Sequence, residues 1–270
     1  MSTNPNALQF NKHLTPAKYF KTAYMSGASK TNGGIAYLLV NHALQVVYLL
    51  PLLLLWRNLM AGGVEAGMSL PQMLTYTYLG VIFADVLVVQ TPASNWLYEG
   101  LLISLYQRPM GVLRHLAAQT VGNWIPTLLL FSGPMLLAAP LFGVSLSSHS
   151  WWALPSLLLC ISLGFAVDFM FACVTIRLQN ASWLVYSIRS ALVVFLSGRV
   201  IPFAAFPWGI GELLQYLPLG SLAAAPLALY TGLADAGPTI ALQIGWNIVL
   251  WPLALWIWKR AQEGMVSYGG

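Results

Sequence analysis

Three ionisable side chains lie inside long apolar stretches of the sequence: Asp85, Asp168 and Arg189. Charged groups in such surroundings are costly, and they mark ion pathways, proton relays or paired charges. Counting about 1.5 Å per helical residue from the nearest polar boundary places all three in one layer. We therefore expect Arg189 to pair with Asp168 or Asp85, because an unpaired charge there would be expensive. A coupling-ion site is the alternative interpretation of the same residues.

The motifs of nucleotide hydrolysis and of common hydrolases are missing. The sequence contains no G-x-x-x-x-G-K-[ST], no G-x-S-x-G and no H-E-x-x-H, which would supply a phosphate cradle, an activated serine or a zinc site. Cys160 and Cys173 both stand in apolar runs, and the histidines have no ligand spacing. We therefore expect no catalytic residue, no metal site and no ATP hydrolysis by this chain itself.

Membrane helices are the elements expected to position these residues. Of the 270 residues, 58% are hydrophobic and only 7% are charged, whereas a soluble domain has roughly 25% charged residues. The apolar runs are continuous, which favours helices over the alternating strands of a membrane barrel. The sequence predicts an all-α integral membrane protein with a single domain over residues 1–270.

Six apolar runs are long enough to cross a bilayer core, which takes about 20 residues per helix. They cover residues 34–56, 71–90, 119–142, 153–175, 183–202 and 238–258. On the side of the two termini the segments between them carry Lys12, Lys18, Lys21, Lys30, Arg108, Arg114, Arg177, Lys259 and Arg260. The other side has only Arg57 and Arg199. The positive-inside rule therefore predicts that both termini are cytoplasmic.

Two short amphipathic helices are expected outside the spans. The first, at residues 14–26, has Tyr19 and other aromatic residues opposite Lys18, so we expect it to lie in the cytoplasmic interface of the membrane. The second, at residues 99–110, has an apolar face that includes Leu105. A linker between spans does not need such a face, whereas a docking surface for a soluble partner does.

The run LSGRVIPFAAFPWGIGELLQYLP, residues 196–218, is apolar yet rich in helix breakers. Pro202 ends a helix by removing a backbone donor. We interpret residues 203–232 as a re-entrant segment on the outer side, and we expect Arg199 and Glu212 to lie close together there. The outer gate would consist of Arg199, Pro202, Phe206, Pro207 and Glu212.

The order of these motifs resembles a known family. Glu99-Gly100 precedes Leu105-Tyr106-Gln107-Arg108-Pro109, Leu196-Ser197-Gly198 precedes Ile201-Pro202 and Phe206-Pro207, and the chain ends in Tyr268-Gly269-Gly270. This combination resembles the permease subunits of type-2 ABC exporters, in particular compact six-span bacterial permeases. The resemblance covers essentially the whole chain. Gln107 and Arg199 depart from the family pattern.

The resemblance implies two permease chains, identical or paralogous, and two separate nucleotide-binding ATPase subunits. ATP and Mg²⁺ would be bound by the ATPase, with no cofactor on this chain. It also implies that residues 99–110 form a coupling helix, whose ATPase-coupling residues would be Glu99, Gly100, Leu105, Arg108 and Pro109. The expected location is the bacterial inner (cytoplasmic) membrane, with lipids as further partners and no nucleic acid.

The activity implied by the resemblance is export by alternating access through a cavity between the second and fifth spans of the two chains. Its expected lining residues are Tyr76, Phe83, Leu192, Val193 and Phe195, for which ordinary helix packing is the alternative. Such a lining would suit a hydrophobic or amphipathic compound, such as a drug, a lipid or a peptide.

Two other classes of function remain open. An ion-coupled secondary transporter would use Asp85 or Asp168, although such carriers usually have broken helices in both halves of the chain. A membrane anchor or assembly factor would not transport anything. An ATPase that co-purifies with the chain would distinguish the exporter from both.

Overall fold

The computed structural model describes residues 16–32, 34–64, 66–93, 104–105, 110–178 and 182–268. Within these ranges all regular structure is helical, without a strand. Four helical stretches are long and apolar enough to cross a membrane: Ile35–Ala61, Val112–Phe142, Ala153–Thr175 and Ala236–Ala261. The prediction of an all-α, multi-pass membrane protein is therefore confirmed at this level.

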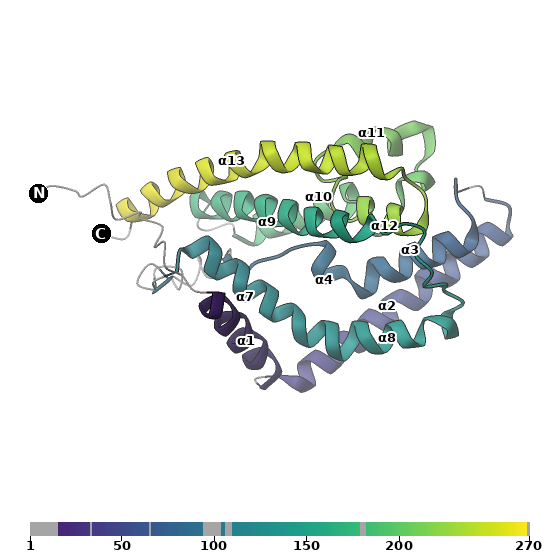
Figure 1. The fold of residues 1–270 in the computed structure, drawn as a ribbon, viewed down its shortest axis with the longest axis horizontal. Coiled ribbons are helices and arrows are strands. Elements are labelled where there is room, and N and C mark those ends of the chain that lie inside the picture. Colours follow the sequence, from purple (N-terminus) through teal and green to yellow (C-terminus); the bar gives the residue numbers. More distant parts are fainter. Residues whose placement is uncertain are drawn as a thin grey trace, which may run out of the picture.

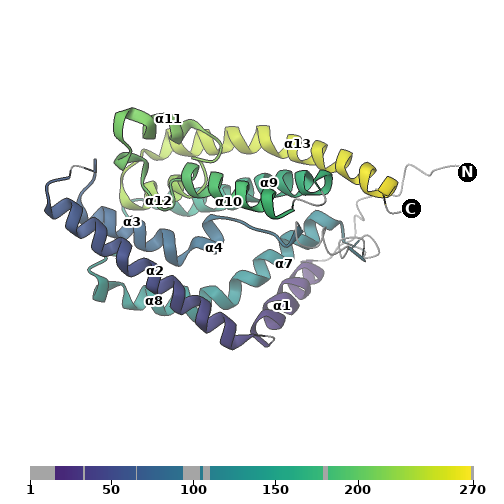
Figure 2. The ribbon, with the colours of Figure 1, turned by 180° about the vertical axis from the view of Figure 1, so that it is seen from behind.

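The helices follow one another without domain-sized insertions. The elements are α1 (Pro16–Asn32), α2 (Ile35–Ala61), α3 (Leu70–Ile82), α4 (Ala84–Leu87), α7 (Val112–Thr127), the π-helical η2 (Leu128–Ser132), α8 (Gly133–Ala138), the 3-10 turn η3 (Ala139–Phe142), α9 (Ala153–Arg177), α10 (Ser182–Leu196), the 3-10 turns η5 (Phe203–Ala205) and η6 (Pro207–Gly209), α11 (Ile210–Tyr216), α12 (Ala224–Thr231) and α13 (Ala236–Tyr268). Helices α9 and α13 run side by side along the molecule, and α3 lies between them and α2 (Figure 1). From behind, α10 lies beside α9 (Figure 2).

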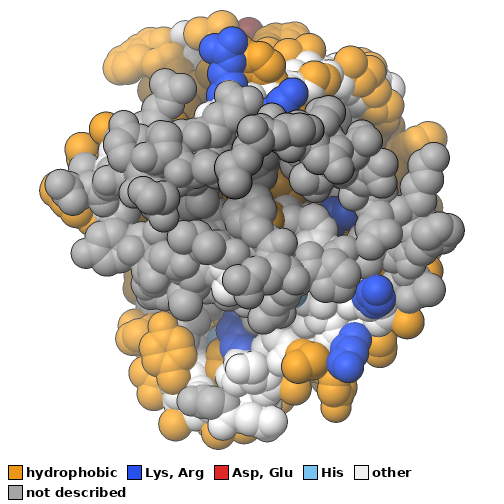
Figure 3. All heavy atoms as spheres, turned by 90° about the vertical axis from the view of Figure 1, so that its left-hand side faces the viewer, with side chains coloured by type: hydrophobic (Ala, Val, Ile, Leu, Met, Phe, Trp, Pro, Cys, Tyr) orange, Lys and Arg blue, Asp and Glu red, His pale blue; other side chains and the backbone are white. Residues whose placement is uncertain are grey.

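Basic side chains gather at one end of the molecule, which we call the basic end. Helix α1 begins there and α13 finishes there (Figure 1). Lys and Arg side chains are exposed on this face between hydrophobic ones (Figure 3). The described residues that supply them are Lys18, Lys21, Arg114, Lys259 and Arg260.

The opposite end, called the distal end, comprises residues 143–152, 197–217 and 232–235. Its loops are joined by hydrogen bonds: the backbone N–H of His149 donates to the Tyr230 carbonyl at 2.8 Å, and the Tyr230 hydroxyl donates to the Leu146 carbonyl. Burial raises the pKa of Tyr230 above its usual range, so the phenol remains a donor at neutral pH. The loop before α9 is therefore fastened to α12.

The predicted interfacial helix is longer than expected and lies along α7. It begins at Pro16 and continues to Asn32, beyond the predicted end at residue 26. A Cβ at Gly122 would lie 2.0 Å from the Ala23 carbonyl oxygen, and one at Gly27 would lie 2.7 Å from the Gly122 carbonyl oxygen. The two backbones are thus in direct contact, and the Ser26 hydroxyl donates to the Asn123 side chain at 2.7 Å.

The stretch Val112–Phe142 has 31 residues, which corresponds to about 46 Å of helix. A bilayer core is about 30 Å thick, so this stretch is longer than a straight crossing needs. The contact with α1 covers nearly the whole of α7, from Arg114 to Thr127. Helix α1 therefore packs against the first half of this stretch.

The apolar run at residues 71–90 does not form one continuous helix. Helix α3 ends at Ile82, Phe83 has non-helical torsion angles, and α4 contains only four residues. The Ile82 carbonyl accepts a hydrogen bond of 2.6 Å from the Ser132 hydroxyl. Ser132 belongs to the π-helical turn η2, where an i to i+5 pattern changes the direction of the side chains. The carbonyl group at the interruption of the second apolar run is thus hydrogen-bonded by a hydroxyl group of the third run.

Candidate functional site

The guanidinium of Arg189 on α10 and the carboxylate of Asp168 on α9 form a buried ion pair. Arg189 Nη2 lies 2.9 Å from Asp168 Oδ1, and the two side chains are 7% and 5% exposed. The predicted pairing of Arg189 is therefore confirmed, with Asp168 as the partner. An ion pair removes much of the cost of placing each charge at this depth.

The same pair holds the extended chain that follows α4. Asp168 Oδ2 accepts hydrogen bonds from the Thr91 backbone N–H at 2.9 Å and from the Thr91 hydroxyl at 2.5 Å. Arg189 Nη2 donates to the Val89 carbonyl at 2.5 Å. Residues 88–92 are not helical, so their backbone groups need partners from outside. The ion pair supplies those partners.

The register of α9 matches this extended segment. Cys160, Gly164 and Asp168 are spaced by four residues on α9. The Cys160 thiol lies 3.6 Å from the Leu87 carbonyl, and a Cβ at Gly164 would lie 2.7 Å from Val89 Cγ2. Four helical residues advance about 6.0 Å and two extended residues about 6.6 Å. One face of α9, which carries residues 160, 164 and 168, therefore lies beside residues 87, 89 and 91 in that order.

The held segment leads towards the predicted coupling helix. Leu105 is 1% exposed and belongs to a buried cluster with Val86, Val89 and Ala93. Of the predicted ATPase-coupling residues only Leu105 is described; Glu99, Gly100, Arg108 and Pro109 lie outside the described residues. The arrangement can pass a displacement of this region to α9 and α10, because both helices grip the chain just before it.

Asp85 does not join the ion pair. It lies half-buried on α4, and His42 and Arg199 are ionisable groups that interact with it electrostatically. His42 is stacked on Phe131 with ring centroids 4.9 Å apart. Asp85 thus stands at the interruption of the second run without a hydrogen bond from any described residue.

Arg199 and Glu212 form no ion pair among the described residues. Gly198 has φ of +66° and turns the chain, so that the Arg199 carbonyl lies 2.8 Å from where a Cβ on Gly80 would be. Arg199 is therefore half-buried against α3, whereas Glu212 is exposed on α11.

The other predicted gate residues occupy different surroundings. Pro202 is buried, Phe206 is half-buried with its ring 6.2 Å from that of Phe203, and Pro207 is exposed. Helix α11 is largely exposed, while the following α12 is buried against α3 and α9. Helix α12 is therefore the buried part of the segment 203–232.

The predicted cavity-lining residues do not come together within one chain. The buried Tyr76 hydroxyl donates to the Gly198 carbonyl at 2.7 Å, so this side chain fastens α3 to the distal end. Val193 is buried and Phe83 half-buried, whereas Leu192 and Phe195 are 38% and 63% exposed on α10. Two of these positions therefore face outwards, where lipid or another chain would cover them.

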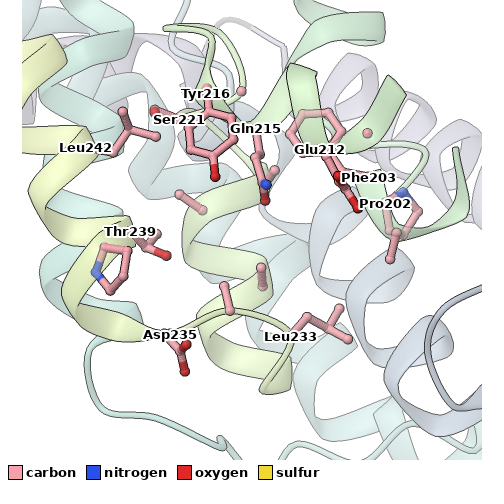
Figure 4. A pocket seen from close by; sticks show the side chains of 18 of the residues that line it. Pro202, Phe203, Glu212, Gln215, Tyr216, Ser221, Leu233, Asp235, Thr239 and Leu242 are labelled. Carbon is pink, nitrogen blue, oxygen red and sulfur yellow. The ribbon is translucent and has the colours of Figure 1, made fainter. Parts of the chain in front are cut away.

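A pocket of about 670 Å³ at the distal end was not foreseen from the sequence. It lies between α11, α12 and the start of α13, and Figure 4 shows Glu212, Gln215 and Tyr216 projecting from α11 into it. Asp235 lies at its other side. The turn formers Gly232 and Pro238 flank Asp235 and were the available sign of an exposed turn there.

Comparisons of the chain with protein-family models, with curated proteins and with solved structures found no match.

Proposed function

We propose that this chain is the transmembrane permease subunit of an ATP-driven ABC transporter that exports a hydrophobic or amphipathic compound. The observation that carries the proposal is the extended segment 88–92, held by Asp168 and Arg189 a few residues before the region of residues 99–110. A docking helix that follows such a connection can move α9 and α10 when an ATPase subunit moves it.

The proposal includes an orientation and a number of spans. Basic side chains at the basic end favour a cytoplasmic location for that end. We count six spans by adding α3 with α4, and α10, to the four long helices. At 13 and 15 residues, α3 and α10 are short for a bilayer, and burial of α3 among its neighbours supports its place inside the bundle. The membrane would be the bacterial inner membrane.

The proposed complex contains a second permease chain and two ATPase subunits. The outward side chains of α2 and α10 are large and apolar, among them Tyr37, Leu44, Val47, Trp183 and Phe195. Lipid or a second permease, identical or paralogous, would cover them. ATP and Mg²⁺ would bind to the ATPase subunits and not to this chain.

The decisive experiment is reconstitution of the chain with a Walker-motif ATPase that co-purifies with it. Glu99→Gln and Arg108→Ala should let ATP hydrolysis continue while substrate-stimulated hydrolysis and export are lost. Lys259→Ala, an exposed change at the same end, is the matched control and should behave as the native chain. Unchanged coupling in both variants would remove the assignment of the coupling helix.

The second candidate is an ion-coupled secondary transporter. Asp168 is a poor ion site because both carboxylate oxygens already have partners. Asp85 suits this role better, since it is half-buried beside the interruption of the second run. Transport by the purified chain under an ion gradient alone, abolished by Asp85→Asn, would establish this function and exclude the ATP-driven one.

A further inference from the structure

The distal pocket has the size of a site for a small organic molecule. Its volume of about 670 Å³ falls within the range of roughly 300–1,000 Å³ for ligand pockets. Small residues lie along its walls, among them Gly211, Gly220, Ala225 and Ala228. At Gly211 a Cβ would lie 1.9 Å from the Phe203 carbonyl oxygen, and at Gly220 it would lie 2.0 Å from the Leu214 carbonyl oxygen. The walls are therefore backbone held in close contact.

The charge in the pocket is negative. Glu212 and Asp235 both line it, and neither carboxylate has a hydrogen bond or ion pair with a described residue. Glu212 belongs to α11, and Asp235 directly precedes α13. No described Lys or Arg side chain lines the pocket. The two carboxylates are therefore its charged groups.

Apolar and aromatic side chains surround the two carboxylates. Phe203, Tyr216, Met68 and Leu242 contribute to the walls together with the small residues. Aromatic faces attract organic cations as well as apolar groups. In Figure 4 the ring of Tyr216 and the carboxylate of Glu212 project from the same helix. The pocket thus offers an apolar body and an anionic group side by side.

A buried hydroxyl without a partner is a second, independent sign of a ligand. Ser221 is 2% exposed and lines the pocket, and its Oγ has no hydrogen-bond partner among the described residues. The Ser221 carbonyl, in contrast, accepts a hydrogen bond of 2.9 Å from Gln243 Nε2. Buried polar atoms are rarely left unsatisfied, so an occupant with a polar group would complete this wall.

We propose that the distal pocket binds an organic cation with an apolar body. An anion would be repelled by Glu212 and Asp235, and a neutral compound would gain nothing from them. Binding depends on the pocket alone, so it holds whether or not an ATPase drives transport. The cation would come either from the water phase or from a lipid with an ammonium headgroup.

The test uses two probes of the same shape and opposite charge. Equilibrium binding of radiolabelled tetraphenylphosphonium and of tetraphenylborate is measured on the purified full chain in phosphatidylglycerol nanodiscs, with empty nanodiscs subtracted. We expect saturable binding of the cation only. Adding phosphatidylethanolamine distinguishes the two sources: competition identifies a lipid headgroup, and undiminished binding identifies a free cation. Equal saturable binding of both probes, or of neither, would overturn the proposal.

Variants locate the site and keep the test valid if one of them folds poorly. Glu212→Gln and Asp235→Asn should each weaken cation binding by about threefold to tenfold, as expected for partly exposed charges. Gln215→Glu adds a carboxylate to the same wall and should strengthen binding, whereas Ala234→Phe should fill the pocket and abolish it. Lys259→Gln changes a charge at the basic end and should leave the dissociation constant unaltered. Binding that is unchanged in the first four variants would refute the assignment.

Discussion

Arg189 and Asp168 lie 2.9 Å apart, and each of them also binds the backbone of the extended segment 88–92. Helices α9 and α10 are therefore joined to each other and to the chain between α4 and residue 94 by one small group of atoms. An ion pair that only neutralised two charges would not need these backbone contacts. The arrangement connects α9 and α10 with the segment that precedes the predicted docking helix.

Removing one partner of this pair should be costly. Arg189→Met leaves the Asp168 carboxylate buried without its cation, and we expect the free energy of unfolding to fall by about 3–5 kcal/mol. Thermal unfolding of the detergent-purified protein, followed by the loss of the monodisperse peak, measures this. Lys21→Met, at an exposed cation of α1, should change stability by less than about 0.5 kcal/mol.

Exchanging the two charges should restore only part of that loss. In the Asp168→Arg, Arg189→Asp protein the ion pair can form again, but an arginine at position 168 cannot accept the hydrogen bonds from Thr91. We expect a stability between those of the single variant and the native chain. Full restoration would show that the Thr91 contacts contribute nothing.

Thr91→Val removes one donor and keeps the shape of the side chain. The Thr91 hydroxyl donates to Asp168 at 2.5 Å, and a hydrogen bond to a charged group contributes about 1.5–3 kcal/mol. We expect a loss of that size in unfolding measurements. Thr175→Val is the matched control, because its hydroxyl only donates within α9, and it should have a much smaller effect.

Ser132→Ala tests the interruption of the second run. The Ser132 hydroxyl satisfies the Ile82 carbonyl where α3 ends. Without it a buried acceptor remains unpaired, which costs about 1–3 kcal/mol. Ser187→Ala removes a hydroxyl that donates to the Trp183 carbonyl within the exposed face of α10, and it should be nearly neutral. Equal unfolding temperatures for the two variants would contradict the role assigned to Ser132.

Gly122→Ala should detach α1 from α7. The added methyl group would lie 2.0 Å from the Ala23 carbonyl oxygen, so the two backbones must separate. Gly245→Ala is the control: nothing lies within 4 Å of a Cβ there, and replacing a glycine inside a helix favours the helix by up to about 1 kcal/mol. Cross-linking of cysteines placed at positions 26 and 123 should fall in the first variant and persist in the second. Undiminished cross-linking after Gly122→Ala would exclude the close contact.

Hydropathy was sufficient to locate the long helices but not the break at Phe83. The run at 119–142 is observed within Val112–Phe142, and that at 238–258 within Ala236–Ala261. The break between α3 and α4 has no glycine or proline beside it. It is stabilised by Ser132, which lies 50 residues away in the sequence. A contact between residues so far apart leaves no pattern in the sequence around Phe83.

For the charged residues, too, some features could be predicted from the sequence and others depended on contacts between distant parts of the chain. The cost of an unpaired buried charge was enough to predict that Arg189 has a carboxylate partner. The third member, Thr91, could not be predicted, because its role follows from the register between α9 and the extended segment. Arg199 and Glu212 were both expected near the outer boundary, but the turn at Gly198 places the Arg199 backbone against Gly80 of α3.

The position of Arg189 in a helix of 15 residues has a consequence for how the protein is made. A short segment with a central arginine enters a bilayer poorly by itself. Helix α9, with 25 residues, precedes it in the chain and already holds the matching carboxylate when α10 leaves the ribosome. If α10 crosses the membrane as proposed, we expect it to enter together with α9 as a hairpin, because the Asp168 carboxylate is then already in place for Arg189.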